Sequence, residues 1–420
     1  MRAARPVALV ALLGVVASIL LASPVSADNI RDKEYWLSDY GIATAWKTTK
    51  GAGVTVAIID TGVDGSHPDL TGTVVGGTDV SGIGSANGQT PVGTDSEHAT
   101  MVASLLAGHG HGPGNADGIL GVAPGVKILS VSVGFGAGAI DSDTQIASGV
   151  RWAADHGADI INMSLTRNTL DWPTSWDDAF LYAMKKGVII VAAAGNRGSG
   201  TTEVGAPATM PGVVVVAGVN QNGNASFDAS AQGITLSVSA PSEGLIGAGP
   251  GGGYFEWAGT SGATPLVVGV LALIKASHSN LSAGNIINRL TATATPKGSA
   301  ITYGSGLMNA ATAVSAKVAA VSTDPVSDLS EWIRLNRRAA SSTAPSAAAS
   351  SGVAAPSTRA SAAPGAVVQS PFGRILPSME SLRTVGVPVL VYLVFATLLV
   401  LVLRALWRET AAVRRDQRKL

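Results

Sequence analysis

The sequence GVTVAIIDTGVDGSHPDL, residues 53–70 of a 420-residue chain, opens with an apolar run and then changes to turn residues. The run is rich in valine and isoleucine, which favour strands, and both of its faces are apolar. Strands of this kind are typical of a parallel sheet covered by helices on both sides. Four further runs share this character: VKILSVSV (126–133), ADIINMSL (158–165), GVIIVAAAG (187–195) and GVVVVAGV (212–219).

Segments with helical periodicity lie between these runs. Their apolar residues recur at spacings of three and four, and each segment ends at a glycine, which commonly terminates helices. The segments are HATMVASLLAG (98–108), DTQIASGVRWAADHG (143–157) and SWDDAFLYAMKKG (175–187). The alternation predicts an α/β fold with a mainly parallel sheet between helices. Ligands of such folds bind at the carboxyl ends of the strands.

The two ends of the chain predict export and a membrane anchor. Residues 1–27 have arginines, an apolar stretch and small residues at the end, which is the layout of a secretory signal peptide. Residues 385–403 are uncharged and long enough to cross a bilayer as one helix, and the basic tail 404–420 favours a cytoplasmic C-terminus. We therefore expect a single-pass protein of the cell membrane, with a folded extracytoplasmic domain (28–320) and an Ala/Ser/Pro-rich linker (321–384).

The composition argues against a nucleic-acid partner and excludes disulfide bonds. Lys and Arg together number 28, as do Asp and Glu, and the exported part has no basic block, so nucleic acid is not expected as a partner. The chain contains no cysteine, so its exported domain is held together without disulfides.

Asp60 ends the first strand-like run and is the first candidate for chemistry. A carboxylate at the end of an apolar strand is costly to desolvate unless it has a partner, so a partner is implied. Six histidines are available: His67, His98, His109, His111, His156 and His278. His98 begins a predicted helix at the rim of the sheet, whereas His156 and His278 end helices, where capping suffices. His98 is therefore the best candidate for a base on local grounds.

Ser261 lies in WAGTSGATPLVVGVLALI, residues 257–274, at the start of a long apolar run. Serine before such a run is most often a helix cap. It is also suited to act as a nucleophile if His98 takes its proton and Asp60 orients the imidazole. Pro265 fits near the start of a helix, where its missing N–H costs nothing. Taken alone, this stretch leaves both roles open.

Five motifs in order resemble those of the subtilisin-like serine proteases, the subtilases. They are AIIDTGVDGSHPDL around Asp60, EHATMVASLLAG around His98, IINMSL around Ser164, VIIVAAAGN ending at Asn196, and GTSGATPLVVGVLAL around Ser261. The resemblance covers residues 40–315 and implies the three-layer subtilisin-like fold. The short lead-in and the predicted anchor are most similar to mycosins, the membrane-anchored subtilases of type VII secretion in actinobacteria.

The resemblance also implies roles for individual residues. Asp60, His98 and Ser261 would form a catalytic triad, and the Asn196 amide would join the Ser261 N–H in an oxyanion hole. An extended peptide or protein substrate would pair with the edge formed by Ser164, Leu165 and Thr166. The pocket for the residue before the scissile bond would be lined by Ala192, Ala193, Ala194 and Gly195. The chemistry requires no cofactor and no catalytic metal, and no ligand pattern assigns a structural calcium ion.

Alternatives to an active protease remain at this stage. Ala99 stands where subtilases usually have glycine after the histidine, which suggests a weakly active or inactive protease fold serving as a scaffold in a secretion complex. The acidic and histidine residues between 95 and 111 suggest a metal site, but HExxH is absent. GAGPGGG, residues 247–253, lacks the Lys-Ser/Thr of a phosphate-binding loop, so a turn is expected there.

Overall fold

The computed structural model describes residues 30–322 and 324–342. Its centre is a seven-stranded sheet with parallel neighbours, in the order β2-β5-β1-β6-β7-β8-β9. The strands are β1 (Thr55–Asp60), β2 (Val74–Asp79), β5 (Lys127–Ser132), β6 (Ile160–Met163), β7 (Ile189–Ala193), β8 (Val214–Val219) and β9 (Val238–Pro241). All five predicted runs are strands of this sheet, and the predicted α/β fold is confirmed.

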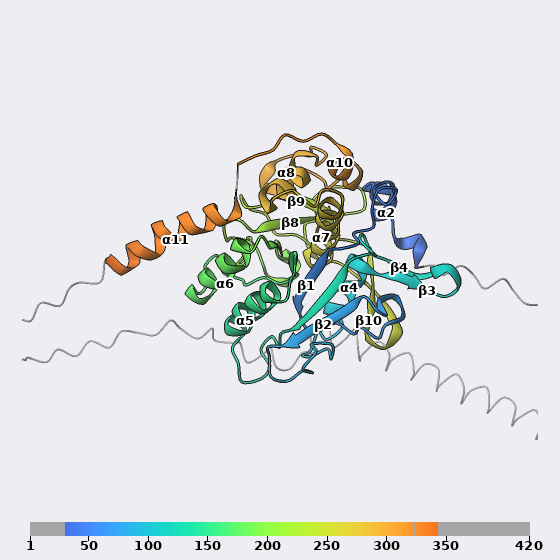
Figure 1. Cartoon of the computed structure of the whole chain (residues 1–420), viewed down its shortest axis with the longest axis horizontal. Helices are drawn as coiled ribbons and strands as arrows, with labels where there is room; N and C mark the ends of the chain where they lie inside the picture. Colours follow the sequence, from blue (N-terminus) through green and yellow to red (C-terminus); the bar gives the residue numbers. More distant parts are fainter. Residues whose placement is uncertain (1–29, 323, 343–420) are drawn as a thin grey trace, which may run out of the picture. The chain divides into compact units, whose positions relative to one another are not determined.

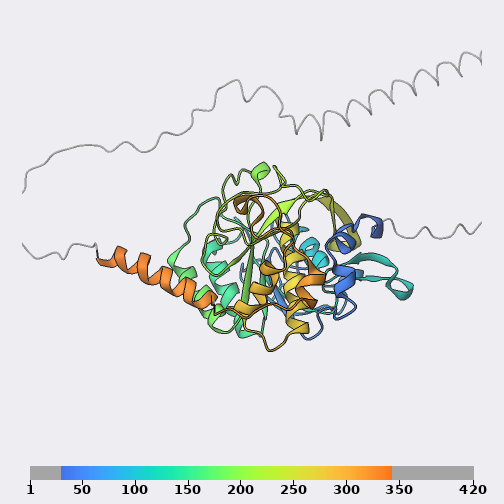
Figure 2. The ribbon, with the colours of Figure 1, turned by 90° about the horizontal axis from the view of Figure 1, so that it is seen from above.

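Helices cover both faces of the sheet (Figures 1 and 2). On one face lie α4 (His98–Ala107) and α7 (Thr260–Ser277), and on the other lie α5 (Ser142–Asp155) and α6 (Thr174–Lys185). Strand β1 shows why its run is apolar throughout: Val56 and Ile58 pack into the α4/α7 core, and Ala57 and Ile59 pack into the α5/α6 core.

Smaller elements complete the domain. The N-terminal part forms η1 (Arg31–Lys33), α2 (Trp36–Asp39) and α3 (Ile42–Ala45), and short turns form η2 (Pro68–Leu70), η3 (Pro113–Asn115), η4 (Arg197–Ser199) and η5 (Pro250–Gly252). Helices α8 (Ala283–Ala292), α9 (Ala300–Tyr303) and α10 (Ala310–Ser315) follow α7.

Two antiparallel hairpins lie outside the main sheet. One pairs β3 (His109–His111) with β4 (Asp117–Leu120), and the other pairs β10 (Leu245–Gly249) with β11 (Gly253–Trp257). The glycine-rich stretch 247–253 was expected to be a turn, but only its centre turns and its two ends are strand residues. This hairpin packs on α4, where Gly247 leaves space for Met101.

Helix α11 (Pro325–Ser342) corrects the predicted start of the linker at residue 321. Leu329 is fully buried, and Trp332 and Ile333 pack against the α5/α6 core. Arg337 pairs with Asp177 of α6 at 2.7 Å. The folded domain therefore extends past residue 320 through a helix whose apolar residues recur at helical spacing. The Ala/Ser/Pro-rich composition starts only near residue 339.

Within the described ranges, α7 is the one helix long and apolar enough to span a membrane by length and composition. Its hydrophobic window is 78% buried inside the domain, so it serves as a core helix. The predicted signal peptide (1–27), anchor (385–403) and tail (404–420) lie outside the described residues, as does the linker beyond residue 342.

Candidate active site

The carboxyl end of β1 brings Asp60 and His98 together. Nδ1 of His98 lies 2.9 Å from each carboxylate oxygen of Asp60. The Thr61 N–H also donates to Asp60 Oδ1 at 2.7 Å, and the carboxylate is 1% exposed. The partner implied for this buried carboxylate is therefore the imidazole. Because Nδ1–H donates to Asp60, Nε2 of the neutral ring is left as the acceptor.

The electrostatics of His98 favour its protonated form. Burial lowers the pKa of the imidazole, but the charge and hydrogen bond of Asp60 outweigh it, with smaller help from Asp95 and Glu97. The net result is a pKa raised above the ordinary value of 6.5. A base with a raised pKa loses its proton-accepting form already at mildly acidic pH.

Ser261 is the second residue of α7. Its hydroxyl caps no N–H of the helix but donates to the Ser164 carbonyl oxygen at 3.1 Å. The Ser164 hydroxyl in turn donates to the Ser261 carbonyl oxygen at 2.7 Å. Among the described residues, no hydrogen bond joins Nε2 of His98 to the Ser261 hydroxyl in this rotamer. Catalytic hydrogen bonds often form only in the substrate complex.

Trp257 links His98 to the start of α7. The two rings meet edge to face, with centroids 5.7 Å apart. The same indole lies 3.2 Å from the point that a Cβ would occupy on Gly262, the residue after Ser261. The imidazole and the residue after Ser261 therefore both lie against this ring.

Asn196 follows β7 and faces the same helix terminus. Its Oδ1 accepts the Thr260 N–H at 2.8 Å and the Thr260 hydroxyl at 2.9 Å, which leaves its NH₂ group as the donor. Gly259 makes this approach possible: its φ of 147° suits glycine, and a Cβ there would lie 2.9 Å from Asn196 Nδ2.

Comparison with known proteins agrees with this geometry. The sequence model of the Subtilase family (Peptidase S8) matches residues 51–306. The chain belongs to the subtilase family. It is accordingly a subtilisin-family serine endopeptidase that acts on protein substrates.

Bacillus subtilisins are among the similar sequences. Subtilisin DY of Bacillus licheniformis is 39% identical over 263 residues, which cover 62% of this chain and 90% of that protein. Subtilisin E of Bacillus subtilis (strain 168) is also 39% identical, over 62% of this chain and 65% of that protein.

Solved mycosin structures are similar as well. MycP1 with its N-terminal propeptide removed is 31% identical and has a TM-score of 0.58, covering 68% of this chain and 97% of that one. MycP1 from Mycobacterium smegmatis is 30% identical and has a TM-score of 0.59, covering 71% of this chain and 88% of that one.

The predicted substrate-binding residues of this subtilase lie at and just beyond the carboxyl ends of two neighbouring strands. Met163 of β6 pairs with Ala192 of β7, so the segments that follow, 164–166 and 193–195, run side by side. The methyl groups of Ala192 and Ala194 belong to the α5/α6 core. Gly195 is left to face the segment 164–166, and its N–H donates to Thr260 Oγ1 at 3.1 Å.

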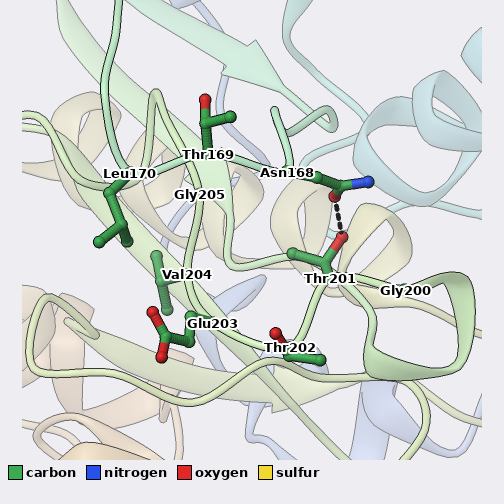
Figure 3. Close-up of a pocket in the computed structure, with 9 residues that line it drawn as sticks. All are labelled: Asn168, Thr169, Leu170, Gly200, Thr201, Thr202, Glu203, Val204 and Gly205. Carbon is green, nitrogen blue, oxygen red and sulfur yellow. Dashed lines mark hydrogen bonds between the residues drawn. The ribbon is translucent and has the colours of Figure 1, made fainter. Parts of the chain in front are cut away.

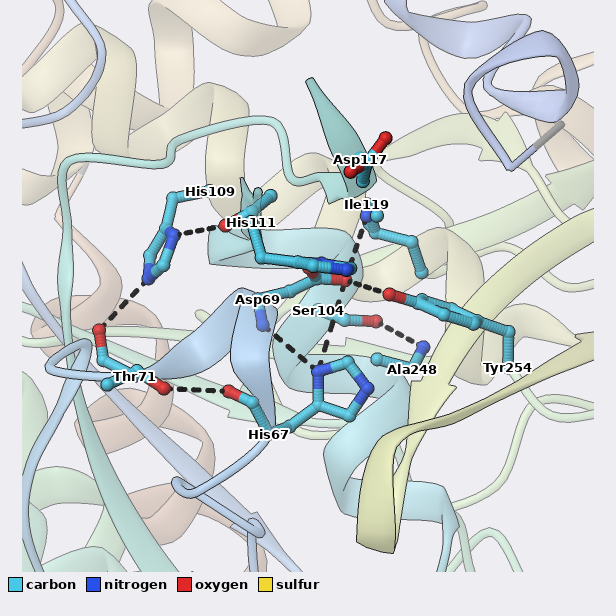
Figure 4. A network of polar contacts seen from close by, with 12 residues as sticks. His67, Asp69, Thr71, Ser104, His109, His111, Asp117, Ile119, Ala248 and Tyr254 are labelled. Atoms are coloured by element: carbon cyan, nitrogen blue, oxygen red, sulfur yellow. Dashed lines mark hydrogen bonds and ion pairs between the residues drawn. The ribbon is translucent and has the colours of Figure 1, made fainter. Parts of the chain in front are cut away.

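The other histidines of the subtilase lie elsewhere. His67, His109 and His111 belong to a polar network around the buried Asp69 (Figure 4). Asp69 accepts from the His111 ring at 2.6 Å and from the Tyr254 hydroxyl at 2.9 Å. His156 and His278 follow α5 and α7 as C-caps, as expected. No group of three potential ligand side chains suited to a metal ion occurs in the described part of the chain.

Sequence reasoning missed three residues that position the site. Thr260 is fully buried and ties Asn196 to Gly195, Asn162 donates to the Ser164 hydroxyl at 3.0 Å, and Trp257 contacts His98. The sequence offered a signal for Thr260, because this polar residue between Gly259 and Ser261 directly precedes a long apolar run. Ala99, which raised doubt about activity, packs into the α4/α7 core, and its N–H donates to Thr61 Oγ1.

Proposed function

We propose that Asp60, His98 and Ser261 are the catalytic triad of this endopeptidase. The observation that carries the proposal is the contact of His98 Nδ1 with both oxygens of Asp60 at 2.9 Å. This contact fixes the tautomer in which Nε2 accepts a proton. In the proposed reaction the Ser261 hydroxyl leaves the Ser164 carbonyl, to which it donates in this structure, and donates to that nitrogen instead.

The proposed reaction proceeds through an acyl-enzyme. Nε2 of His98 takes the hydroxyl proton as Ser261 Oγ attacks the peptide carbonyl carbon, and the imidazolium then gives this proton to the leaving amine. Water, deprotonated by the same nitrogen, hydrolyses the ester and returns the serine. Asp60 stabilises the imidazolium in both halves of the reaction. The direct test is fluorophosphonate labelling of the full chain at neutral pH, with the label mapped to Ser261.

In this proposal the Asn196 NH₂ group and the Ser261 N–H stabilise the oxyanion. Thr260 supports this role because it holds Asn196 Oδ1 at 2.8 Å and so turns the amide nitrogen outward. The positive end of α7 lies at the same place.

Replacing Asn196 with alanine is expected to lower kcat about 10²- to 10³-fold with little change in KM, a loss known for the corresponding asparagine of a subtilisin. The measurement is steady-state cleavage of a chromogenic peptide. Asn222→Ala, on an exposed loop, serves as the control and should behave like the unmodified protein. Unchanged kcat in Asn196→Ala would remove this residue from the oxyanion hole.

We further propose that the protease is held at the cell membrane by residues 385–403, with its domain outside the cytoplasm and its tail inside. The uncharged span and the basic residues after it support this placement. A role beside type VII secretion components is supported by the likeness to MycP1, one structure of which comes from the ESX-1 type VII secretion system.

The anchor makes a testable prediction. The full chain is expected to stay with membranes after alkaline carbonate extraction, whereas a chain ending at residue 384 is expected to be released into the soluble fraction. A full chain with the tail residues Arg414 and Arg415 replaced by glutamine is the control and should remain in the membrane fraction. Release of the full chain by carbonate would contradict the proposed anchor.

A scaffold with little turnover is the second candidate. It is favoured by the Ser261 hydroxyl, which donates to Ser164 and not to His98 in this structure. Under this alternative, Ser261→Ala leaves secretion intact; a secretion defect caused by this single change would reject a purely structural role.

A further inference from the structure

Helix α11 lies beyond the part of the chain that matches the subtilase family, yet it is fastened to the protease domain. The family match ends at residue 306, and α11 begins at Pro325 and lies beside α6 (Figure 1). Arg337 of α11 donates to Asp177 of α6 twice, from Nε to Oδ2 at 2.7 Å and from Nη2 to Oδ1 at 3.3 Å. The Asp177 side chain is 8% exposed. Two parallel bonds to a buried carboxylate fix the orientation of the guanidinium.

The guanidinium also lies over two indole rings. Its carbon is 5.6 Å from the centre of the Trp172 ring and 5.1 Å from that of Trp332. Nε1 of Trp172 donates to Asp177 Oδ1 at 2.7 Å, and Arg337 Nη2 donates to the Trp172 carbonyl oxygen at 3.0 Å. Arg337 therefore holds the main chain of Trp172 directly and its side chain through Asp177.

Trp172 lies near the end of the loop between β6 and α6, residues 164–173, which we call the β6–α6 loop. The loop begins at Ser164, which exchanges two hydrogen bonds with Ser261. Its first three residues are the predicted substrate edge, 164–166. One loop thus runs from the proposed nucleophile to Arg337.

The middle of the β6–α6 loop is exposed, and Leu170 is 56% exposed. A pocket of about 150 Å³ is lined by residues 168–170 of the loop and by residues 200–205 (Figure 3). A hydrogen bond from the Thr201 hydroxyl to Asn168 Oδ1, 2.5 Å long, joins the two segments. The pocket takes the place of packed side chains on this side of the loop. The position of the loop therefore depends strongly on the contacts near its ends.

Two arginines make these contacts, and both use the start of α6. Arg167 directly follows the predicted substrate edge, pairs with Asp143 of α5 and lies over the Trp176 ring, 5.6 Å from its centre. Trp176 precedes Asp177, the residue that Arg337 holds. The start of α6 thus connects Arg337 to the residue next to the edge.

We propose that Arg337 of α11 is a positioning residue that keeps the segment 164–166 ordered before a substrate binds. The inference rests on the proposed function, in which an extended peptide pairs with this segment. A segment that is already ordered spares the substrate the entropy cost of ordering it. Because the described partners of Arg337 lie on α6, on α11 and at the far end of the loop, its effect falls on substrate binding and not on the chemical step.

The test compares two substrates with the full chain in detergent. One is a peptide with several residues before the scissile bond, and the other is an ester of a single acetylated amino acid, too short to pair with the segment 164–166. Arg337→Met keeps a long side chain over the indoles but has no hydrogen-bond donor. It is expected to raise KM for the peptide about 10-fold at unchanged kcat, the pattern of lost ground-state binding. Both constants for the ester should stay unchanged.

Arg334→Met is the matched control. Arg334 lies on the same helix and donates to Glu331 at 2.7 Å, but this pair is exposed. Its loss should leave KM for the peptide at the value of the unmodified protein.

A purely structural role gives a different result. Arg337→Met leaves the buried Asp177 carboxylate without this cation, which lowers stability. If the single variant does not fold, Asp177→Asn/Arg337→Met removes the charge as well, and the same rise in KM for the peptide is expected. A lower midpoint of thermal unfolding with unchanged KM for the peptide overturns the inference, as does an equal change for both substrates. If the unmodified protein cleaves neither substrate, the proposed function fails instead, so the two failures are distinguishable.

Discussion

Peptide cleavage by the Ser261→Ala variant is expected to fall about 10⁶-fold in kcat, the size of the loss known for a subtilisin without its nucleophile. Alanine has no oxygen to form the acyl-enzyme, so the remaining rate reflects only binding and oxyanion stabilisation. Fluorophosphonate labelling should disappear together with the activity. The measurement compares kcat for one peptide in the unmodified and altered full-length chains.

The fold should not depend on this hydroxyl. Ser261 Oγ makes a single 3.1 Å hydrogen bond to the Ser164 carbonyl and caps no N–H of α7, so the midpoint of thermal unfolding should change little. Ser277→Ala at the other end of α7 also removes one hydroxyl-to-backbone bond and is the matched control, with full activity expected. Cleavage by Ser261→Ala at more than about one hundredth of the normal rate would show that another residue is the nucleophile.

The Asp60→Asn variant is expected to lose about 10⁴-fold in kcat, as happens when the aspartate of such a triad is replaced. The asparagine amide donates a hydrogen bond where Asp60 accepts one, so it favours the tautomer with the proton on Nε2. In that tautomer His98 cannot take the proton of Ser261. Asp171→Asn, an exposed position, controls for the loss of one carboxylate and should retain normal kcat.

The pH profile of the same variant separates catalysis from folding. Cleavage requires neutral His98, and burial lowers the pKa of this ring, but Asp60 outweighs burial and raises the pKa above 6.5. Activity of the unmodified protein should therefore rise as pH increases through this raised pKa. Without the Asp60 charge the lowering effect of burial is less opposed, so the residual activity should rise at a lower pH. An acidic limb at the same pH in both proteins would mean that Asp60 does not act on the base.

Local patterns predicted much of this molecule. The runs around Val56 and Val191 are strands because residues apolar on both faces fit a sheet covered on both sides. Asp60 at the end of such a run implied a partner, because an isolated buried carboxylate is unfavourable, and the structure pairs it with His98. The helix that begins at Pro325 was missed where the chain was expected to become a linker, because its packing partner lies on α6 and is far away in sequence.

Local sequence patterns did not predict which residues of distant segments contact one another. The parallel pairing of β6 with β7 places Thr166 against Gly195, and the second threonine over that glycine, Thr201, belongs to a different loop. Thr260 positions Asn196 across 64 residues of sequence. The sequence alone determined the fold class and the chemical types at the site, because periodicity and motifs are local properties of the chain. Only the tertiary structure decided which residues hold Ser261 and Asn196 in place, because hydrogen bonds and packing depend on distances that no one-dimensional pattern contains.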